Sequence, residues 1–159
     1  MAAEIGHTGM GASAGAVSGH EPRLSRTFLD SNVLVYAEDS AESFKQEKAI
    51  GLILEHGRQR SGVVSLQVLG EYFSAVTRKL KLDPSVARSQ VEFYSRFHVV
   101  EPTVADILAA IDLHRLHRIS YWDSLIIRCA QQSGCRILLS EDMQHGQEID
   151  GVKIVNPFR

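Results

Sequence analysis

Short apolar segments alternate with longer helical segments along most of the chain. The short segments are rich in β-branched residues, as in GVVS and VKIV, which is typical of strands buried on both faces of a parallel sheet. The segments between them carry apolar residues three and four positions apart, which is typical of amphipathic helices. This alternation predicts an α/β protein with three layers, in which a central parallel sheet of about five short strands lies between helices.

The residues that flank each segment bound the predicted elements. Pro84 after Asp83 is a typical helix start, and Gly134 is a typical helix end. The predicted strands are residues 26–30, 62–65, 97–100, 136–140 and 152–155. The predicted helices are residues 32–39, 42–57, 65–80, 83–97, 102–116 and 121–134. In the fifth of these helices the large apolar residues share one side, and they are Val104, Ile107, Leu108, Ile111 and Leu116.

Length and composition fit one globular domain. The chain has 159 residues, of which 44% are hydrophobic and 23% charged. The net charge of −2 means that the chain is not basic overall. A nucleic-acid partner would therefore require a local basic patch. No apolar run reaches the roughly 18 residues of a membrane span. Cys129 and Cys135 lack the CxxC spacing, which indicates two reduced thiols in a cytoplasmic protein.

The first 24 residues differ from the rest in composition. They are rich in Gly, Ala and Ser, and they lack the basic start and apolar core of a secretory signal. We expect residues 1–24 to be a disordered leader, a mis-assigned start or a remnant of cloning. Residues 25–159 are then expected to form the folded domain.

Four acidic residues lie at the ends of predicted elements or among apolar neighbours. Asp30 ends the first strand, Asp142 follows the strand over 136–140, Glu71 lies inside an apolar helix, and Asp123 follows two aromatic residues. Ligands of an open parallel sheet bind beyond the carboxyl ends of its strands, so these carboxylates are candidates for one cluster. Clustered carboxylates cannot all ionise without compensation. The usual compensating ion for oxygen ligands is Mg²⁺ or Mn²⁺, which suits phosphoryl chemistry.

Each of these acids also has a structural alternative. Asp30 and Asp142 fit a helix N-cap and a turn. Asp123 fits the third position of a helix capped by Ser120, and Glu71 fits the solvated side of a helix. We favour the cluster, because the alternative requires four independent coincidences in a fold that brings strand ends together.

At this point the chain resembles the PIN domain family, and within it the VapC-type toxins of bacterial toxin–antitoxin pairs. The resemblance covers nearly all of residues 26–159. FLDSNVLVYA resembles the first motif of the family, a strand that ends in Asp with Asn two residues later, which gives Asp30 and Asn32. SLQVLGEYF resembles the helix that carries the second carboxylate, which gives Glu71.

The other two motifs lie in the second half of the chain. RISYWDSLIIRCA resembles the third motif, an aromatic residue before an Asp at a helix start, which gives Asp123. ILLSEDMQHG resembles the last motif, a strand that ends in Ser or Thr with Asp two residues later, which gives Ser140 and Asp142. Glu141 lies beside Asp142, and the motif favours Asp142 as the acid that faces the site.

The resemblance implies that residues 25–159 form a PIN-like nuclease domain with metal-dependent endoribonuclease activity. Asp30, Glu71, Asp123 and Asp142 would hold one or two Mg²⁺ or Mn²⁺ ions, supported by Asn32 and Ser140. Water would attack the phosphodiester of a structured RNA, tRNA or rRNA, and leave a 5′-phosphate and a 3′-hydroxyl. The resemblance also implies a cognate small antitoxin protein, a homodimer and a cytoplasmic location.

Two groups of basic residues flank the four acids. Arg78 and Lys79 end one helix, and Arg115 and Arg118 precede Asp123. These side chains would bind RNA phosphates near the site. Cations at helix C-termini also interact favourably with the helix dipole, so this second interpretation stays open for each of them.

Other function classes remain as alternatives. A housekeeping PIN nuclease of RNA processing or DNA repair would carry the same acids, and a catalytically silent PIN-like interaction module would have lost some of them. A phosphatase of similar architecture would require D-x-D-x-T at residues 30–34, where the chain has DSNVL. A phospho-receiver would require a Lys after the last strands. Asp112, His114 and His117 lack the ligand set of a zinc site.

Overall fold

A computed structural model describes residues 25–159, and the expectation for residues 1–24 lies outside the described residues. The helices are α1 (Ser31–Tyr36), α2 (Ser43–Arg58), α3 (Leu66–Arg78), α4 (Pro84–Tyr94), α5 (Val104–His117) and α6 (Tyr121–Gln132). The strands are β1 (Thr27–Leu29), β2 (Gly62–Ser65), β3 (His98–Val100), β4 (Ile137–Leu139), β5 (Glu148–Ile149) and β6 (Val152–Val155).

The strands form one sheet in the order β3-β2-β1-β4-β6-β5. The pairs β3·β2, β2·β1, β1·β4 and β4·β6 are parallel, whereas β5 is antiparallel to β6. This arrangement confirms the predicted parallel sheet of five strands. It places β1 and β4, which are more than 100 residues apart in the chain, side by side at the centre of the sheet.

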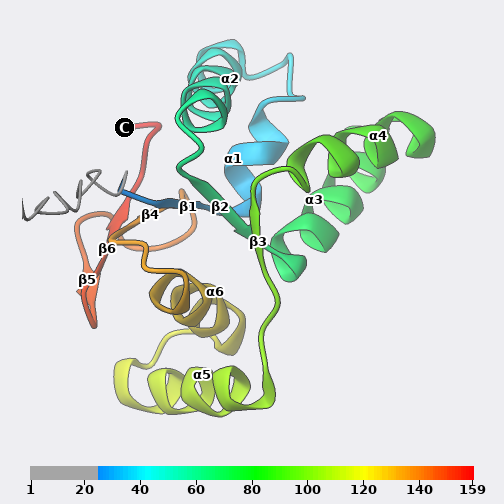
Figure 1. Ribbon diagram of the computed structural model, residues 1–159. Helices are drawn as coiled ribbons and strands as arrows, with labels where there is room; N and C mark the ends of the chain where they lie inside the picture. Colours follow the sequence, from blue (N-terminus) through cyan, green and yellow to red (C-terminus); the bar gives the residue numbers. More distant parts are fainter. Residues whose placement is uncertain (1–24) are drawn as a thin grey trace, which may run out of the picture.

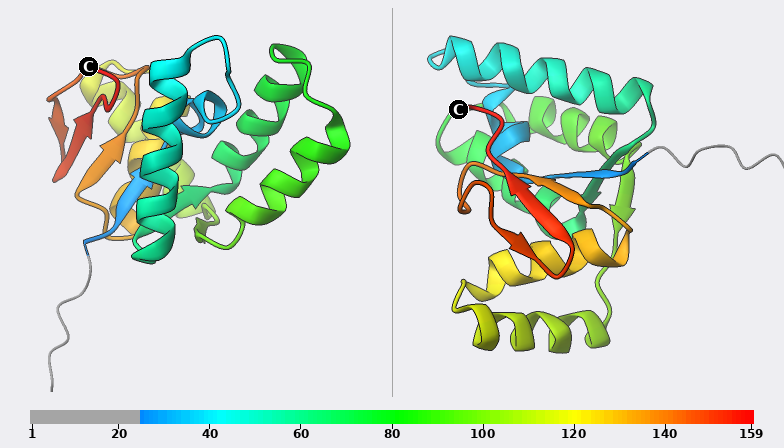
Figure 2. Two further views of the ribbon diagram at one scale, coloured as in Figure 1. Left: turned by 90° about the horizontal axis from the view of Figure 1, so that it is seen from above. Right: turned by 90° about the vertical axis from the view of Figure 1, so that its left-hand side faces the viewer.

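Helices cover both faces of the sheet, as predicted for a three-layer α/β protein (Figure 1). Helices α1 to α4 lie on one face, and α5 and α6 lie on the other, with the sheet between them (Figure 2). The central strands are buried on both faces, since Phe28, Leu29, Val63, Val64 and Leu138 have no exposed surface. The core therefore fixes the carboxyl ends of β1 and β4 from both sides.

Local capping sets where several helices begin. The Ser65 side chain accepts a hydrogen bond from the backbone of Val68 at the start of α3. Thr103 and Asp106 form a reciprocal capping box at the start of α5. Ser120 accepts from the backbone of Asp123 at the start of α6. These caps satisfy backbone N–H groups that have no partner within the helix.

Strand β5 is an addition to the predicted elements. It pairs with β6 through a two-residue turn, Asp150–Gly151, in which both residues have positive φ angles. An Asp-Gly turn of this kind is the characteristic connection of a tight hairpin. The two residues of β5 are too few to give a period of their own in the sequence.

Helix α5 exposes five of its large apolar residues to solvent. Its buried residues are Asp106, Ala110 and Leu113, because Asp106 forms an ion pair with Arg128 of α6 and Ala110 allows close packing. The apolar side predicted from spacing lies opposite this face and is exposed, and its residues are Val104, Ile107, Leu108, Ile111 and Leu116.

No helix among residues 25–159 is both long and apolar enough to cross a membrane. Cys129 and Cys135 are buried free thiols, and burial raises the pKa of both, that of Cys129 to about 11.

Candidate active site

The site begins where β1 and β4 end. Leu29 and Leu139 are paired in register as the last residues of these strands, so Asp30 and Ser140 follow them at the same edge of the sheet. Asp142 comes two residues after Ser140. The parallel pairing therefore brings together residues from the first and last motifs of the sequence, as the sequence predicts for a site beyond strand ends.

Asp30 is the buried centre of this group, with 2% of its surface exposed. One carboxylate oxygen, Oδ1, accepts from the backbone N–H of Ser31 at 2.7 Å. The other, Oδ2, accepts from Ser140 Oγ at 2.7 Å and from Asn32 Nδ2 at 3.2 Å. Asp30 is also the N-cap of α1. It therefore caps the helix and belongs to the polar cluster at the same time.

Asn32 joins the two Asp residues of the site. Its Nδ2 amide lies 3.2 Å from Asp30 Oδ2 and 3.1 Å from Asp142 Oδ2, and it also contacts Ser140 Oγ at 3.3 Å. Its Oδ1 accepts from the backbone N–H of Glu141 at 3.2 Å. The amide therefore holds the loop after β4 against the end of β1, which explains a polar residue two positions after Asp30.

Glu71 comes to the same site from α3. Its Oε2 accepts from Ser31 Oγ at 2.9 Å, and its Oε1 accepts from Gln67 Nε2 at 2.7 Å. Gln67 also contacts the backbone oxygen of Trp122 at 3.4 Å, in the first turn of α6. These bonds connect α1, α3 and the start of α6 around the Glu71 carboxylate.

Asp123 lies in that first turn of α6 and is half-buried. Burial raises its pKa, the Ser120 hydroxyl opposes the rise, and the negative charges of Asp142 and Glu71 add to it. The same two charges act on Asp30. Burial raises the pKa of Asp30 to about 6, although hydrogen bonds from Ser140 and Ser31 lower it. Glu71 and Asp142 therefore lie close enough to both Asp30 and Asp123 to raise the pKa of each.

The chemistry of these donors fits a hard divalent cation, because carboxylate and amide oxygens are the ligands of Mg²⁺ and Mn²⁺. A divalent charge would also favour the ionised form of the buried Asp30. Among residues 25–159, no group of three or more His, Cys, Asp and Glu side chains is arranged to hold a metal ion as it stands. In this arrangement Ser31, Asn32 and Gln67 donate to the carboxylates instead.

The structure separates the four predicted basic residues. Lys79 lines a hollow of about 280 Å³ together with Asn32 and Asp142, so it borders the site. Arg78, Arg115 and Arg118 are exposed, and within the described part of the chain no hydrogen bond or ion pair joins them to the four carboxylates. Arg118 is the C-cap of α5, in the left-handed conformation.

Sequence reasoning missed two residues that contact the site. Gln67 precedes Glu71 by four residues on one helix, a spacing at which side chains meet, so this contact could have been predicted. Ser31 lies between two motif residues, but its bond to Glu71 joins positions 40 residues apart. No pattern in the sequence indicates which helix its hydroxyl faces.

Comparisons with known proteins agree with this geometry. The family model described as PIN domain matches residues 27–147. Among solved structures, the sarcin–ricin-loop-cleaving toxin VapC20 of Mycobacterium tuberculosis superposes with a TM-score of 0.60 at 16% identity, over 73% of this chain and 91% of that one. A chain of a toxin–antitoxin complex from Klebsiella pneumoniae gives 0.59 at 16% identity, over 82% and 97%. No curated protein sequence matches the chain.

The family match covers most of the chain, including Asp30, Asn32, Glu71, Asp123 and Asp142. The two solved structures share the fold over nearly their whole length. Together with the order of the motifs and the strand order of the sheet, these findings confirm the resemblance predicted from the sequence. The chain belongs to the PIN domain family.

Proposed function

We propose that this protein is a metal-dependent endoribonuclease, the toxin of a toxin–antitoxin pair. The observation that carries the proposal is the approach of four carboxylates, Asp30, Glu71, Asp123 and Asp142, at the carboxyl edge of a PIN-type sheet. The raised pKa values of Asp30 and Asp123 support it. Burial is the main cause of both shifts, and the charges of Glu71 and Asp142 add to it, as expected for a site that lacks a compensating cation.

In this proposal the chain positions the reaction, and the same four carboxylates would hold one or two Mg²⁺ or Mn²⁺ ions. A bound ion would supply Lewis-acid catalysis, which neutralises charge on the scissile phosphate and lowers the pKa of the attacking water. Asn32 and Ser140 orient Asp30 and the loop that carries Asp142. Lys79 lines the same hollow as Asn32 and Asp142, and it would attract a backbone phosphate.

The substrate and partner parts of the proposal draw on the family and the two solved structures. We propose structured RNA, tRNA or rRNA, as substrate, with cleavage that leaves a 5′-phosphate and a 3′-hydroxyl. We also propose a small antitoxin that silences the site, and a homodimer in the cytoplasm. One of the two similar structures is a toxin–antitoxin complex, and the other is described as a sarcin–ricin-loop-cleaving toxin.

The test is cleavage of purified tRNA and rRNA by the wild type and by Asp30→Asn and Asp142→Asn, with Mn²⁺, with Mg²⁺ and with EDTA. The wild type should cut only with metal, and each variant should lose more than about 100-fold in rate, beyond the usual effect of outer-shell changes. Asp112→Asn, an exposed acid on α5, is the matched control and should cut normally.

Four outcomes contradict parts of the proposal. Cleavage by Asp30→Asn at the wild-type rate would show that the assigned residues are not the catalytic site. Cleavage in EDTA would show that the reaction needs no metal ion. If the protein neither cuts RNA nor binds Mn²⁺, the catalytically silent module would be the correct interpretation, and cleavage without growth arrest on expression would favour a housekeeping nuclease.

A further inference from the structure

The loop after β4 carries two adjacent acids that point in different directions. The Asp142 carboxylate accepts from Asn32, at the cluster. The Glu141 carboxylate instead accepts from Lys45 Nζ and from the Tyr36 hydroxyl. Lys45 is near the start of α2 and Tyr36 is the last residue of α1. The two helices therefore hold the Glu141 carboxylate, whereas Asn32 holds that of Asp142.

Contacts with two aromatic residues fix the position of the Lys45 ammonium. It lies 3.1 Å from Tyr36 Oη, 4.6 Å from the centre of the Tyr36 ring and 6.0 Å from that of Phe158. The two rings pack edge to face at 4.9 Å. Only 27% of the Lys45 side chain and 24% of the Glu141 side chain are exposed. Contacts to aromatic faces and partial burial make this pair more rigid than an exposed ion pair.

Glu141 is nevertheless close enough to the site to interfere with it. Its backbone N–H donates to Asn32, the residue that joins Asp30 and Asp142. Glu141, Asp142 and Asn32 line the same hollow. Without its partners on α1 and α2, the Glu141 carboxylate is free to turn within this hollow toward Asp142. There it would add a further negative charge beside the four carboxylates.

We propose that Lys45 is a positioning residue of the site: it holds the Glu141 carboxylate against α1 and α2, so that Asp142 alone of the two adjacent acids faces the metal. This inference rests on the metal-dependent function proposed above. It assigns Lys45 no contact with RNA. It also gives Glu141 no positive role, so neutralising Glu141 should be harmless.

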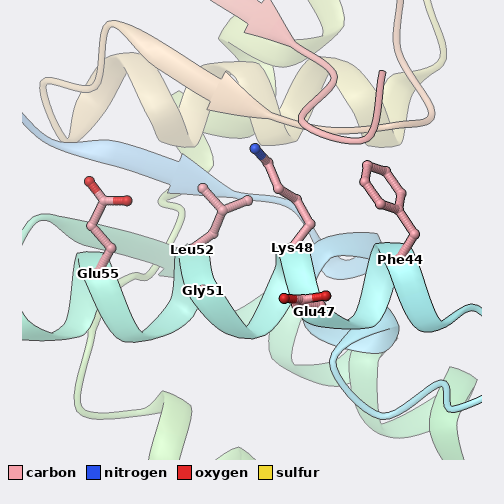
Figure 3. A pocket seen from close by; sticks show the side chains of 6 residues that line it. All are labelled: Phe44, Glu47, Lys48, Gly51, Leu52 and Glu55. Atoms are coloured by element: carbon pink, nitrogen blue, oxygen red, sulfur yellow. The ribbon is translucent and has the colours of Figure 1, made fainter.

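The closing experiment is a calorimetric titration of the metal-free protein with Mn²⁺, which requires no RNA cleavage. The proteins are the wild type, Asp30→Asn, Lys45→Met, Glu141→Gln and the double variant Lys45→Met/Glu141→Gln. Lys48→Met is the matched control, because Lys48 is exposed on the same helix and lines a different hollow with Phe44 and Leu52 (Figure 3). Thermal unfolding checks that each variant folds, and Lys45→Gln replaces Lys45→Met if the latter does not.

Lys45→Met should weaken Mn²⁺ binding by about 10- to 100-fold, the range of outer-shell changes. Glu141→Gln and Lys48→Met should bind like the wild type, and Glu141→Gln should restore binding to Lys45→Met. If Lys45→Met and Glu141→Gln weakened Mn²⁺ binding equally, the ion pair would stabilise the loop only through its bond. If Lys45→Met bound Mn²⁺ like the wild type, Lys45 would not position the site. Either result overturns this inference alone, whereas a wild type that binds no Mn²⁺ overturns the proposed function itself.

Discussion

Replacing Asp30 by Asn should abolish activity and yet stabilise the metal-free protein at neutral pH. Asp30 is 2% exposed, and burial, with smaller contributions from Glu71 and Asp142, raises its pKa from 3.8 to about 6. The folded state therefore binds this proton more tightly than the unfolded state. As a result, the free energy of unfolding falls as the pH rises from about 4 to about 6, and it stays lower above that range.

The magnitude follows from this difference in pKa. One pKa unit corresponds to about 1.4 kcal/mol, so ionised Asp30 lowers the stability of the fold by about 3 kcal/mol above pH 6. Asn removes this charge. It also replaces one oxygen that accepts from Asn32 and Ser140 by an amide group, at a cost of about 1 kcal/mol. The variant should be more stable than the wild type by about 2 kcal/mol at pH 7.5, and less stable by about 1 kcal/mol below pH 4.

The assay is urea unfolding followed by circular dichroism, in EDTA, at pH 4 and at pH 7.5. Asp112→Asn is the control for removal of an acid and should follow the wild type at both pH values, because Asp112 is exposed. The diagnostic result is the change of sign between the two pH values. A variant that is less stable than the wild type at pH 7.5 would refute the conclusion that the buried charge is uncompensated without metal.

Three further predictions concern other parts of the molecule. Arg128→Met should lower the free energy of unfolding by about 2–3 kcal/mol, because it leaves the buried Asp106 without its ion-pair partner, and urea unfolding without a shift would contradict it. Ser140→Ala should raise the pKa of Asp30 above about 6, since the Ser140 hydroxyl lowers it, and a carboxyl titration by NMR that finds a lower value would contradict it. Cys129, whose pKa burial raises to about 11, should react with thiol reagents at pH 8 only after unfolding, and rapid labelling of the native protein would contradict its burial.

Much of the fold could be predicted because each strand and helix carries its own period. The five parallel strands lie within a residue or two of the predicted ranges, since short β-branched runs such as GVVS favour buried strands. Strand β5 was missed because two residues have no period, although the Asp150–Gly151 turn was a usable signal. Helix α5 was predicted with its large apolar residues on one side, but spacing does not say whether a neighbour covers that side, and the structure leaves it exposed.

The four acids and their two polar neighbours could be named as candidates because they follow strand ends or interrupt apolar segments. The contacts that orient them could not. The bond from Ser31 to Glu71 and the pair of Lys45 with Glu141 join residues 40 and 96 positions apart. Such pairs depend on how α1, α2 and α3 pack over the sheet, which no local pattern in the sequence encodes. For the same reason, the choice of Asp142 over Glu141 rested on the motif that the chain resembles and not on a local pattern.

The most direct test of the proposed function is a map of 5′-phosphorylated RNA ends in cells that express the wild type or Asp142→Asn at equal levels. The wild type should produce new 5′-phosphate ends at a small number of positions in tRNA or rRNA, and the variant should produce none of them. No new ends with the wild type, or the same ends with Asp142→Asn, would contradict the assignment of the carboxylate cluster as the catalytic site of a ribonuclease.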